Sequence, residues 1–209
     1  MNKYYPLMLD LTEKPCLVVG GGSVAERKVE SLVKAKAMVT VISPKATGFI
    51  KELNEENALL WEKREYIKGD MKGFFLVVIA TDKFELNREI NQDVNHATQF
   101  VNIVDTPELC TFIVPSVIDR GRLQIAVSTN GASPALAKKI RKDLEARFGE
   151  EYIIYTDFLA EMREWVLNQR FDKAHRKQLF EQLLDDSIFE RVVNGEIEHV
   201  KEEIKTSLR

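Results

Sequence analysis

The sequence predicts an α/β protein with a parallel sheet covered by helices on both faces. Three observations support this class. Apolar, strand-like runs alternate with amphipathic helical segments through the first half of the chain. The first apolar run stops at a glycine cluster, from which a helix begins. After about residue 112 the alternation ends, and a hairpin pattern followed only by helical patterns takes its place.

The glycine cluster lies between a strand expected at 16–19 and a helix, in a G-x-G-x-x-A pattern. Gly20 suits a tight turn, Gly22 lets a pyrophosphate approach the backbone, and Ala25 allows the helix to pack closely on the sheet. Glycines in this place also serve ordinary turns and helix starts, so the pattern alone leaves both interpretations open. A second strand expected at 38–42 favours a Rossmann-type dinucleotide-binding unit.

The rest of the first half continues the alternation. We expect helices around 49–53 and 84–94, a strand beginning near 59, and further strands at 74–80 and 100–104. The 74–80 run is apolar throughout, which is typical of a strand buried on both faces. In such a sheet, ligands bind at the carboxyl ends of the strands.

The second half begins with a hairpin pattern, in which strands at 111–118 and 123–129 are joined by a turn-rich Asp-Arg-Gly-Arg segment. Ser133 as N-cap and Pro134 in the first turn predict a helix that ends before Gly149.

The remainder of the chain has helical patterns, and a capping box from Ser187 to Glu190 is expected to open a late helix. We therefore expect three domains: a Rossmann domain at 1–112, a hairpin–helix module at 113–149 and a helical C-terminal domain at 150–209.

The composition limits the classes of function. A content of 44% hydrophobic and 30% charged residues predicts a soluble globular protein, and the net charge of -3 gives no general electrostatic reason to bind nucleic acid or anionic membranes. The chain has neither an apolar run long enough to span a bilayer nor a signal peptide, so we expect a cytoplasmic protein. The two cysteines and three histidines lack metal-ligand spacing, so no protein metal site is expected.

With these features assembled, the chain resembles the precorrin-2 dehydrogenase and sirohydrochlorin ferrochelatase family, which also forms the N-terminal half of siroheme synthases. The resemblance covers most of the chain and rests on several segments in order. These are Val18–Lys28, Ala80-Thr81-Asp82, Asn102–Asp105, Phe112–Ser116 and Val127–Ala137.

The resemblance implies an enzyme that uses NAD to oxidise precorrin-2 to sirohydrochlorin, on the way to sirohaem or, in some organisms, cobalamin. It implies no other cofactor. Some relatives also act as lyases that insert ferrous iron. It further implies a homodimer in which the module at 113–149 is the dimerisation module, and a tetrapyrrole as the small-molecule partner.

The same resemblance implies the cofactor-binding residues. They are Gly20, Gly22, Ser23, Val24, Ser43, Pro44, Lys45 and Thr81. Ser43 departs from the general pattern, which places an acidic residue near the ribose 2′-hydroxyl. Lys45 is able to attract a 2′-phosphate, so the preference for NAD over NADP rests on the resemblance. At Lys36, relatives often carry glycine, and a positive φ there costs about 1 kcal/mol.

Asp105 is the expected catalytic residue, because it follows the fifth strand at the edge where ligands bind. A carboxylate beside the nicotinamide can accept the proton that dehydrogenation releases. The alternative is that Asp105 caps the Thr106-Pro107 turn. Asp82, after the fourth strand, suits a place facing the cofactor and an N-cap equally, and we expect the structural role of an N-cap.

The expected substrate-binding residues lie in the second half. They are Ser128, Thr129, Asn130, Gly131 and Arg120. The hydroxyls and the following helix start provide donors for the acetate and propionate groups of precorrin-2. Arg120 and neighbouring cations complement the same carboxylates, although a solvated surface role is the alternative for each of them.

Two further functions remain open at this point. The first is a bifunctional enzyme that also inserts iron, for which the scattered histidines give no independent support. The second is a non-enzymatic, dinucleotide-sensing regulatory module, which needs no catalytic carboxylate.

Overall fold

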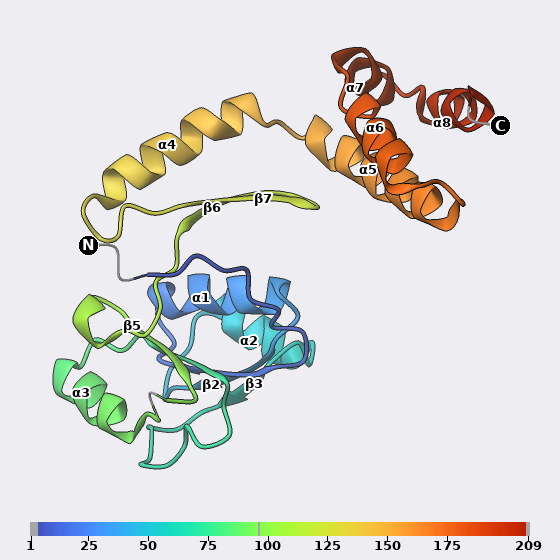
Figure 1. Ribbon diagram of the computed structural model, residues 1–209. Coiled ribbons are helices and arrows are strands. Elements are labelled where there is room, and N and C mark those ends of the chain that lie inside the picture. The colour runs from blue at the N-terminus through green and yellow to red at the C-terminus, as the bar shows by residue number, and fades with distance from the viewer. Residues whose placement is uncertain (1–3, 96, 208–209) are drawn as a thin grey trace. The chain divides into compact units, whose positions relative to one another are not determined.

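The computed structural model describes residues 4–95 and 97–207, with only the backbone of Phe84. The chain forms two compact units, one ending at Val114 and the other beginning at Pro115 (Figure 1). The expected division into three domains, at 1–112, 113–149 and 150–209, stays a prediction.

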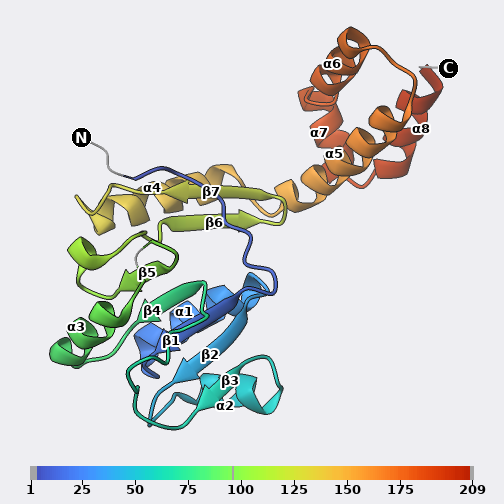
Figure 2. The ribbon, with the colours of Figure 1, turned by 60° about the horizontal axis from the view of Figure 1, so that its bottom comes forward.

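The first unit contains a five-stranded parallel sheet in the order β3-β2-β1-β4-β5 (Figure 2). Its strands are β1 (Pro15–Val19), β2 (Met38–Ile42), β3 (Leu60–Glu62), β4 (Leu76–Ile79) and β5 (Phe100–Ile103). This order reverses next to β1, which is the position where a Rossmann sheet opens a crevice for its ligand. The predicted fold class is confirmed.

Helices cover both faces of this sheet. They are α1 (Ser23–Lys34), α2 (Gly48–Glu55) and α3 (Phe84–Asp93), and a short 3-10 helix, η1 (Pro107–Leu109), follows β5. On one face, Val29 of α1 and Ile50 of α2 pack against Val18. On the other face, Ile90 of α3 packs against Leu17 (Figure 1). The strands are therefore buried from both sides, as their apolar sequences require.

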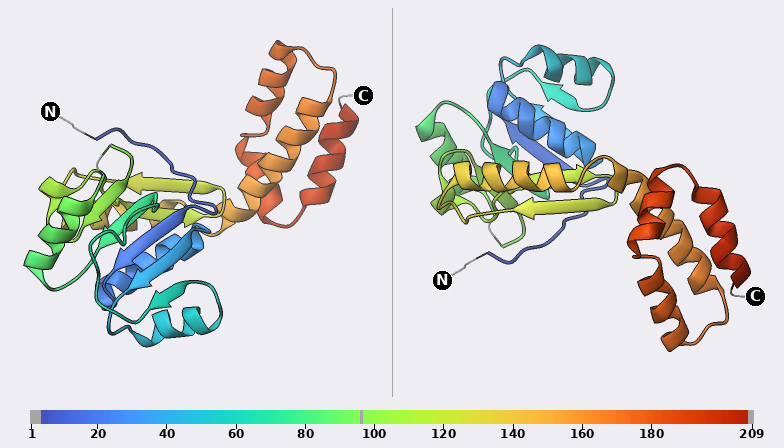
Figure 3. Two further views of the ribbon diagram at one scale, coloured as in Figure 1. Left: turned by 90° about the horizontal axis from the view of Figure 1, so that it is seen from below. Right: turned by 90° about the horizontal axis from the view of Figure 1, so that it is seen from above.

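The second unit begins with an antiparallel hairpin of β6 (Ser116–Arg120) and β7 (Leu123–Val127). Gly121 holds a φ of 66° at the first position of the two-residue loop, where a type II′ turn favours glycine. Helix α4 (Pro134–Arg147) packs along the hairpin (Figure 3). The Ser133 hydroxyl accepts a hydrogen bond from the Leu136 N–H at 3.2 Å, which confirms the predicted N-cap.

The described remainder of the chain is helical, as the sequence predicts, and it forms four helices. They are α5 (Glu151–Asn168), α6 (Lys173–Gln182), α7 (Asp186–Val193) and α8 (Ile197–Ser207). Phe158 and Met162 of α5 form their core with Val192 and Val200. None of the helices within the described ranges is both long and apolar enough to cross a membrane.

Two local expectations were wrong. The first hairpin strand begins at Ser116 and not at Thr111, because the Thr111 N–H bonds to the Val101 carbonyl of β5 at 2.9 Å. The N-cap of α7 is Asp185 and not Ser187, because the Asp185 carboxylate, a stronger acceptor, receives the Ser187 N–H at 2.9 Å.

Candidate functional site

Gly20 lies where the carboxyl ends of three strands, β1, β2 and β4, meet. Its N–H donates to the Ile42 carbonyl at 3.0 Å, and its φ of 121° is unfavourable for other residues. A Cβ atom at this position would lie 2.3 Å from the Ala80 carbonyl oxygen, after β4. Only glycine therefore lets the loops after β1 and β4 approach this closely, a contact that the sequence did not predict.

Gly21 is a position whose role the sequence did not reveal. A Cβ atom there would lie 2.1 Å from the Lys45 carbonyl oxygen, and the Thr47 N–H donates to the Gly21 carbonyl at 3.0 Å. The loop after β2 therefore packs directly on the middle glycine. The uninterrupted run of three glycines is the sequence signal for this contact.

Gly22 differs from the other two glycines because its surroundings are open. It is the N-cap of α1, no side chain caps this helix end, and nothing lies within 4 Å of a Cβ built on it. The N–H groups of Ser23, Val24 and Ala25 have no acceptor within the helix. This open helix start fits a pyrophosphate, whose negative charge those N–H groups stabilise.

The loop after β2 is organised by Ser43. The Ser43 hydroxyl is buried and donates to the Lys45 carbonyl at 2.5 Å, while the Trp61 indole N–H donates to the Ser43 carbonyl at 3.0 Å. Pro44 and Lys45 are exposed. A neighbouring ribose would therefore meet the exposed Lys45 ammonium and no carboxylate from this loop.

Thr81, after β4, belongs to a small polar cluster. Its hydroxyl donates to the Asn87 side-chain oxygen at 2.5 Å, and the Asn87 amide donates back to the Thr81 carbonyl at 3.2 Å. Sequence reasoning missed Asn87, which is 7% exposed. The expectation that Asp82 caps α3 was wrong, because the N-cap is Lys83, whose N–H donates to the Thr81 hydroxyl.

Asp105 lies two residues beyond the carboxyl end of β5. It is exposed and holds a φ of 60°, a left-handed conformation. The N-cap of η1 is Thr106, which makes no side-chain capping bond. Within the described chain, no hydrogen bond or ion pair engages the Asp105 carboxylate. The contacts therefore do not support the capping alternative.

Cys110 contacts the residues on both sides of the turn that carries Asp105. The Cys110 sulfur accepts the Ile103 N–H at 3.1 Å and lies 3.3 Å from the Thr106 carbonyl oxygen. The Val104 N–H donates to the Ile79 carbonyl at 3.0 Å. Asp105 and the glycine turn, which is formed by residues 20–22, therefore lie at the same carboxyl edge of one sheet.

The turn at 128–133 in the second unit brings several expected substrate residues together. The Asn130 N–H donates to the Ser128 hydroxyl at 3.1 Å, and the Thr129 hydroxyl accepts the Ser133 N–H at 3.0 Å. Asn130 and Gly131 both have positive φ angles, 52° and 85°. The Ser133 cap and the missing N–H of Pro134 leave fewer free donors at this helix start than we expected.

Arg120 lies apart from that turn. Its guanidinium donates to the Phe148 carbonyl at 3.0 Å and to the Asp119 carbonyl at 2.9 Å, and it pairs with Glu150 at 3.4 Å. These contacts join the hairpin to the end of α4. They give Arg120 a structural role and do not support the expected role in substrate binding.

Among the residues the structure describes, no cluster of three or more His, Cys, Asp or Glu side chains is arranged to hold a metal ion. Cys16 lies in the core beneath α1, where burial raises the pKa of its thiol to about 11.

Two known protein families and several curated proteins match this chain. The family described as putative NAD(P)-binding matches residues 7–116, and the central family of sirohaem biosynthesis proteins matches residues 120–147. The siroheme synthase of Methylobacillus flagellatus is 39% identical over 92% of this chain, and that of Mannheimia succiniciproducens is 36% identical over 98%. The chain spans only 41% and 43% of these two relatives.

A solved structure is similar over nearly the whole chain. It is SirC, a precorrin-2 dehydrogenase, with a TM-score of 0.84 and 29% identity, and the match covers 97% of this chain and 100% of SirC. The chain therefore belongs to the putative NAD(P)-binding family of sirohaem biosynthesis, in agreement with the resemblance that its sequence segments indicated.

Proposed function

We propose that this chain catalyses the NAD-dependent dehydrogenation of precorrin-2 to sirohydrochlorin. The observation that carries the proposal is the Asp105 carboxylate, which is exposed, unpaired and held at the sheet edge that also bears the open glycine turn. The similarity to the precorrin-2 dehydrogenase SirC supports the same substrate.

The reaction removes a hydride and a proton from the macrocycle. When bound, NAD would supply the hydride acceptor. The Asp105 carboxylate takes the proton, and a carboxylate without a competing partner is suited to this role. The Cys110 contacts hold the backbone of this turn, which fixes the position of the Asp105 backbone at the sheet edge.

The dinucleotide is held by the loops that surround the glycine turn. The N–H groups of Ser23 and Val24 bind the pyrophosphate beside Gly22. The exposed Pro44 and Lys45 contact the adenosine ribose, with Ser43 organising their loop. Thr81, fixed by Asn87, lies after β4 at the same edge.

The carboxylates of the tetrapyrrole are bound by the turn at 128–133. Ser128, Asn130 and Gly131 are exposed there, and their hydroxyl, amide and backbone donors are those that a carboxylate needs. Thr129 supports the turn through its two contacts with Ser133.

The second unit mediates a homodimer. Val117 of β6 is 44% exposed, and Leu136 and Ile140 of α4 are 48% and 37% exposed. A second copy of the chain would cover these apolar side chains.

The variant Asp105→Asn tests the catalytic role. Asparagine tolerates the same φ, so the thermal midpoint should change little. Without a proton acceptor, kcat for NADH formation from precorrin-2 should fall by about 100-fold or more, while the Kd for NAD stays unchanged. Asp82→Asn, at an exposed carboxylate after β4, is the matched control and should retain full activity.

Anaerobic absorbance assays measure both variants beside the wild type. Undiminished turnover by Asp105→Asn would remove Asp105 from the mechanism. A wild-type protein that binds NAD but forms no NADH would instead favour the dinucleotide-sensing module.

A further inference from the structure

Lys28 is an exception among the half-buried cations of this protein. Eight lysine and arginine residues in the described ranges are half-buried. Seven of them bond to a carboxylate or a carbonyl, and they are Arg64, Arg120, Arg141, Arg176, Arg191, Lys201 and Lys205. Lys28 has no such partner among the described residues.

The position of Lys28 on α1 indicates which way it faces. It lies one turn after Val24, on the flank of the buried face formed by Ala25 and Val29. Its ammonium is close enough to the Cys110 thiol for an electrostatic interaction, and Cys110 bonds to the edge strand β5. Lys28 therefore extends from α1 toward β4 and β5.

The sheet surface on that side is apolar and half-buried. Phe100 and Asn102 alternate with the buried Val101 and Ile103, so both face the side of the sheet that α1 covers. Phe100 packs edge-to-face with Phe75 and with Phe112, at centroid distances of 5.2 and 6.2 Å. On this face, α1 contacts β4, and Phe112, in the segment after β5, packs against the same cluster.

Lys28 therefore lies on the side of the sheet where Phe75, Phe100 and Phe112 pack, and the cation over the Phe75 ring itself is Lys14, at 5.9 Å from its centroid. An ammonium on this side of the sheet suits a flat, apolar ligand that carries carboxylates. Burial and the charge of Arg27 lower the pKa of Lys28, whereas the Cys110 thiol raises it, and no carboxylate of the described chain is among the groups that act on this ammonium. A bound carboxylate would supply the missing partner through a charge-assisted hydrogen bond.

We propose that Lys28 binds a carboxylate side chain of the tetrapyrrole, next to the phenylalanine surface of β4 and β5 and to the turn that carries Asp105. This proposal rests on the proposed function. It assigns a substrate-specificity role to a residue of α1 that is not among the expected cofactor-binding residues.

The test is a titration of the full chain with sirohydrochlorin, followed by absorbance in the presence of NAD, in the wild type and two variants. Lys28→Gln should raise the Kd for sirohydrochlorin by about 10-fold, since a charged hydrogen bond is lost. Lys28→Arg should stay within about 3-fold of the wild type, because the charge is kept. Neither variant should change the Kd for NAD.

Lys34→Gln is the control, because Lys34 lies on the same helix but is 74% exposed and pairs with Glu30. Its Kd for sirohydrochlorin should equal that of the wild type. An unchanged Kd in Lys28→Gln would overturn the proposal, and so would a raised Kd for NAD with normal tetrapyrrole binding. The titration involves no turnover, so absence of NADH formation by the wild type would count against the proposed function alone.

Discussion

Asp105 is one of the few non-glycine residues with a positive φ in the described chain. A left-handed conformation costs an L-residue about 1–2 kcal/mol, although aspartate tolerates it better than most. Cys110 and the buried Thr106 hold the turn in place. Strain maintained at an exposed carboxylate is a feature of functional sites, which is why the proposed mechanism depends on this residue.

In the glycine turn, Gly20 is required for the fold, whereas Gly22 is required for binding of the dinucleotide. Gly22→Ala should lower the free energy of unfolding by about 1 kcal/mol or less, because its Cβ meets only open space. The same methyl group lies where the pyrophosphate approaches, so the Kd for NAD should rise at least about 10-fold.

Gly20→Ala should behave differently, because its Cβ would lie 2.3 Å from the Ala80 oxygen. Urea unfolding and NAD titration of both variants check this contrast. Similar losses of stability in the two variants would contradict it.

Lys36 adopts the positive φ that its position, where relatives often carry glycine, suggested. It holds a φ of 59° directly after α1, where the Lys36 N–H bonds to the Val33 carbonyl and the Ala37 N–H to the Leu32 carbonyl. This is a Schellman motif, which favours glycine at that residue. Lys36→Gly should therefore raise the free energy of unfolding by up to about 1 kcal/mol.

Lys36→Ala is the matched control, since it removes the side chain but keeps a Cβ atom. It should give no gain in urea unfolding. Equal stability of the glycine and alanine variants would show that φ is not the cause.

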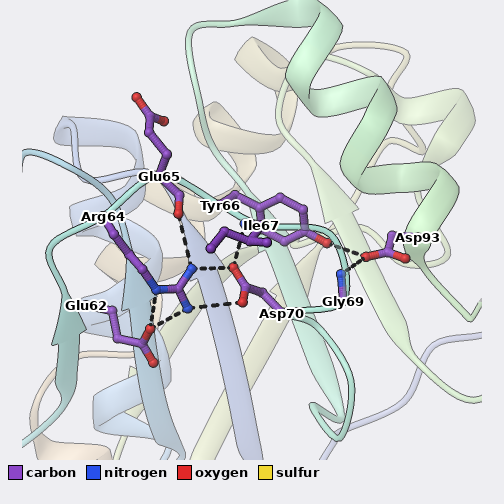
Figure 4. Close-up of polar contacts among 8 residues, drawn as sticks. All are labelled: Glu62, Arg64, Glu65, Tyr66, Ile67, Gly69, Asp70 and Asp93. Carbon is purple, nitrogen blue, oxygen red and sulfur yellow. Dashed lines mark hydrogen bonds and ion pairs between the residues drawn. The ribbon is translucent and has the colours of Figure 1, made fainter.

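At the scale of elements, the loop at 63–75 packs where a helix would normally lie between β3 and β4. Met71, which is 1% exposed, packs on the same face as α3. Arg64 forms two bonds to the Asp70 carboxylate, at 2.6 and 3.0 Å, and Tyr66 donates to Asp93 of α3 at 2.7 Å (Figure 4). Side-chain bonds thus replace the backbone bonds of a helix.

This loop should lose stability in acid. Burial raises the pKa of Asp70, but bonds from Arg64 and the Ile67 N–H more than offset this and hold it below its ordinary value. The Tyr66 hydroxyl and the Gly69 N–H also lower the pKa of Asp93. A lowered folded-state pKa stabilises the fold above the ordinary value of about 4 and ceases to do so as the pH falls through the folded-state value.

The measurement is the free energy of unfolding between about pH 6 and pH 3. Asp70→Asn should reduce stability at pH 6 by about 1–3 kcal/mol, because Arg64 loses its partner, and should flatten the acid limb. Glu65→Gln is the control, since Glu65 and Lys83 form an exposed pair that contributes little. An acid limb of unchanged slope in Asp70→Asn would contradict the assignment.

At the scale of the whole molecule, the exposed apolar side chains of the second unit determine the expected assembly. The wild type should sediment with about twice the 24.0 kDa mass of one chain. Val117→Arg combined with Ile140→Arg should give monomers, because charges would be buried at the contact. Ile67→Arg, at a 62% exposed residue of the first unit, should leave the dimer intact. A monomeric wild type would contradict the proposed interface.

Local patterns in the sequence determined much of this protein. The strand at 38–42, the Ser133 cap and the positive φ at Lys36 were all predictable, because each depends on residues within one or two turns. The order of the elements indicated the sheet, and the glycine cluster indicated the binding edge.

Only the tertiary structure decided which distant groups meet. The pairing of Thr111 with β5, the capping of Phe148 by Arg120, and the packing of Lys45 on Gly21 join residues 10, 28 and 24 positions apart, and no periodicity marks such contacts. The lack of an ion-pair or hydrogen-bond partner for Lys28 among the described residues belongs to the same class, because the sequence alone does not show it.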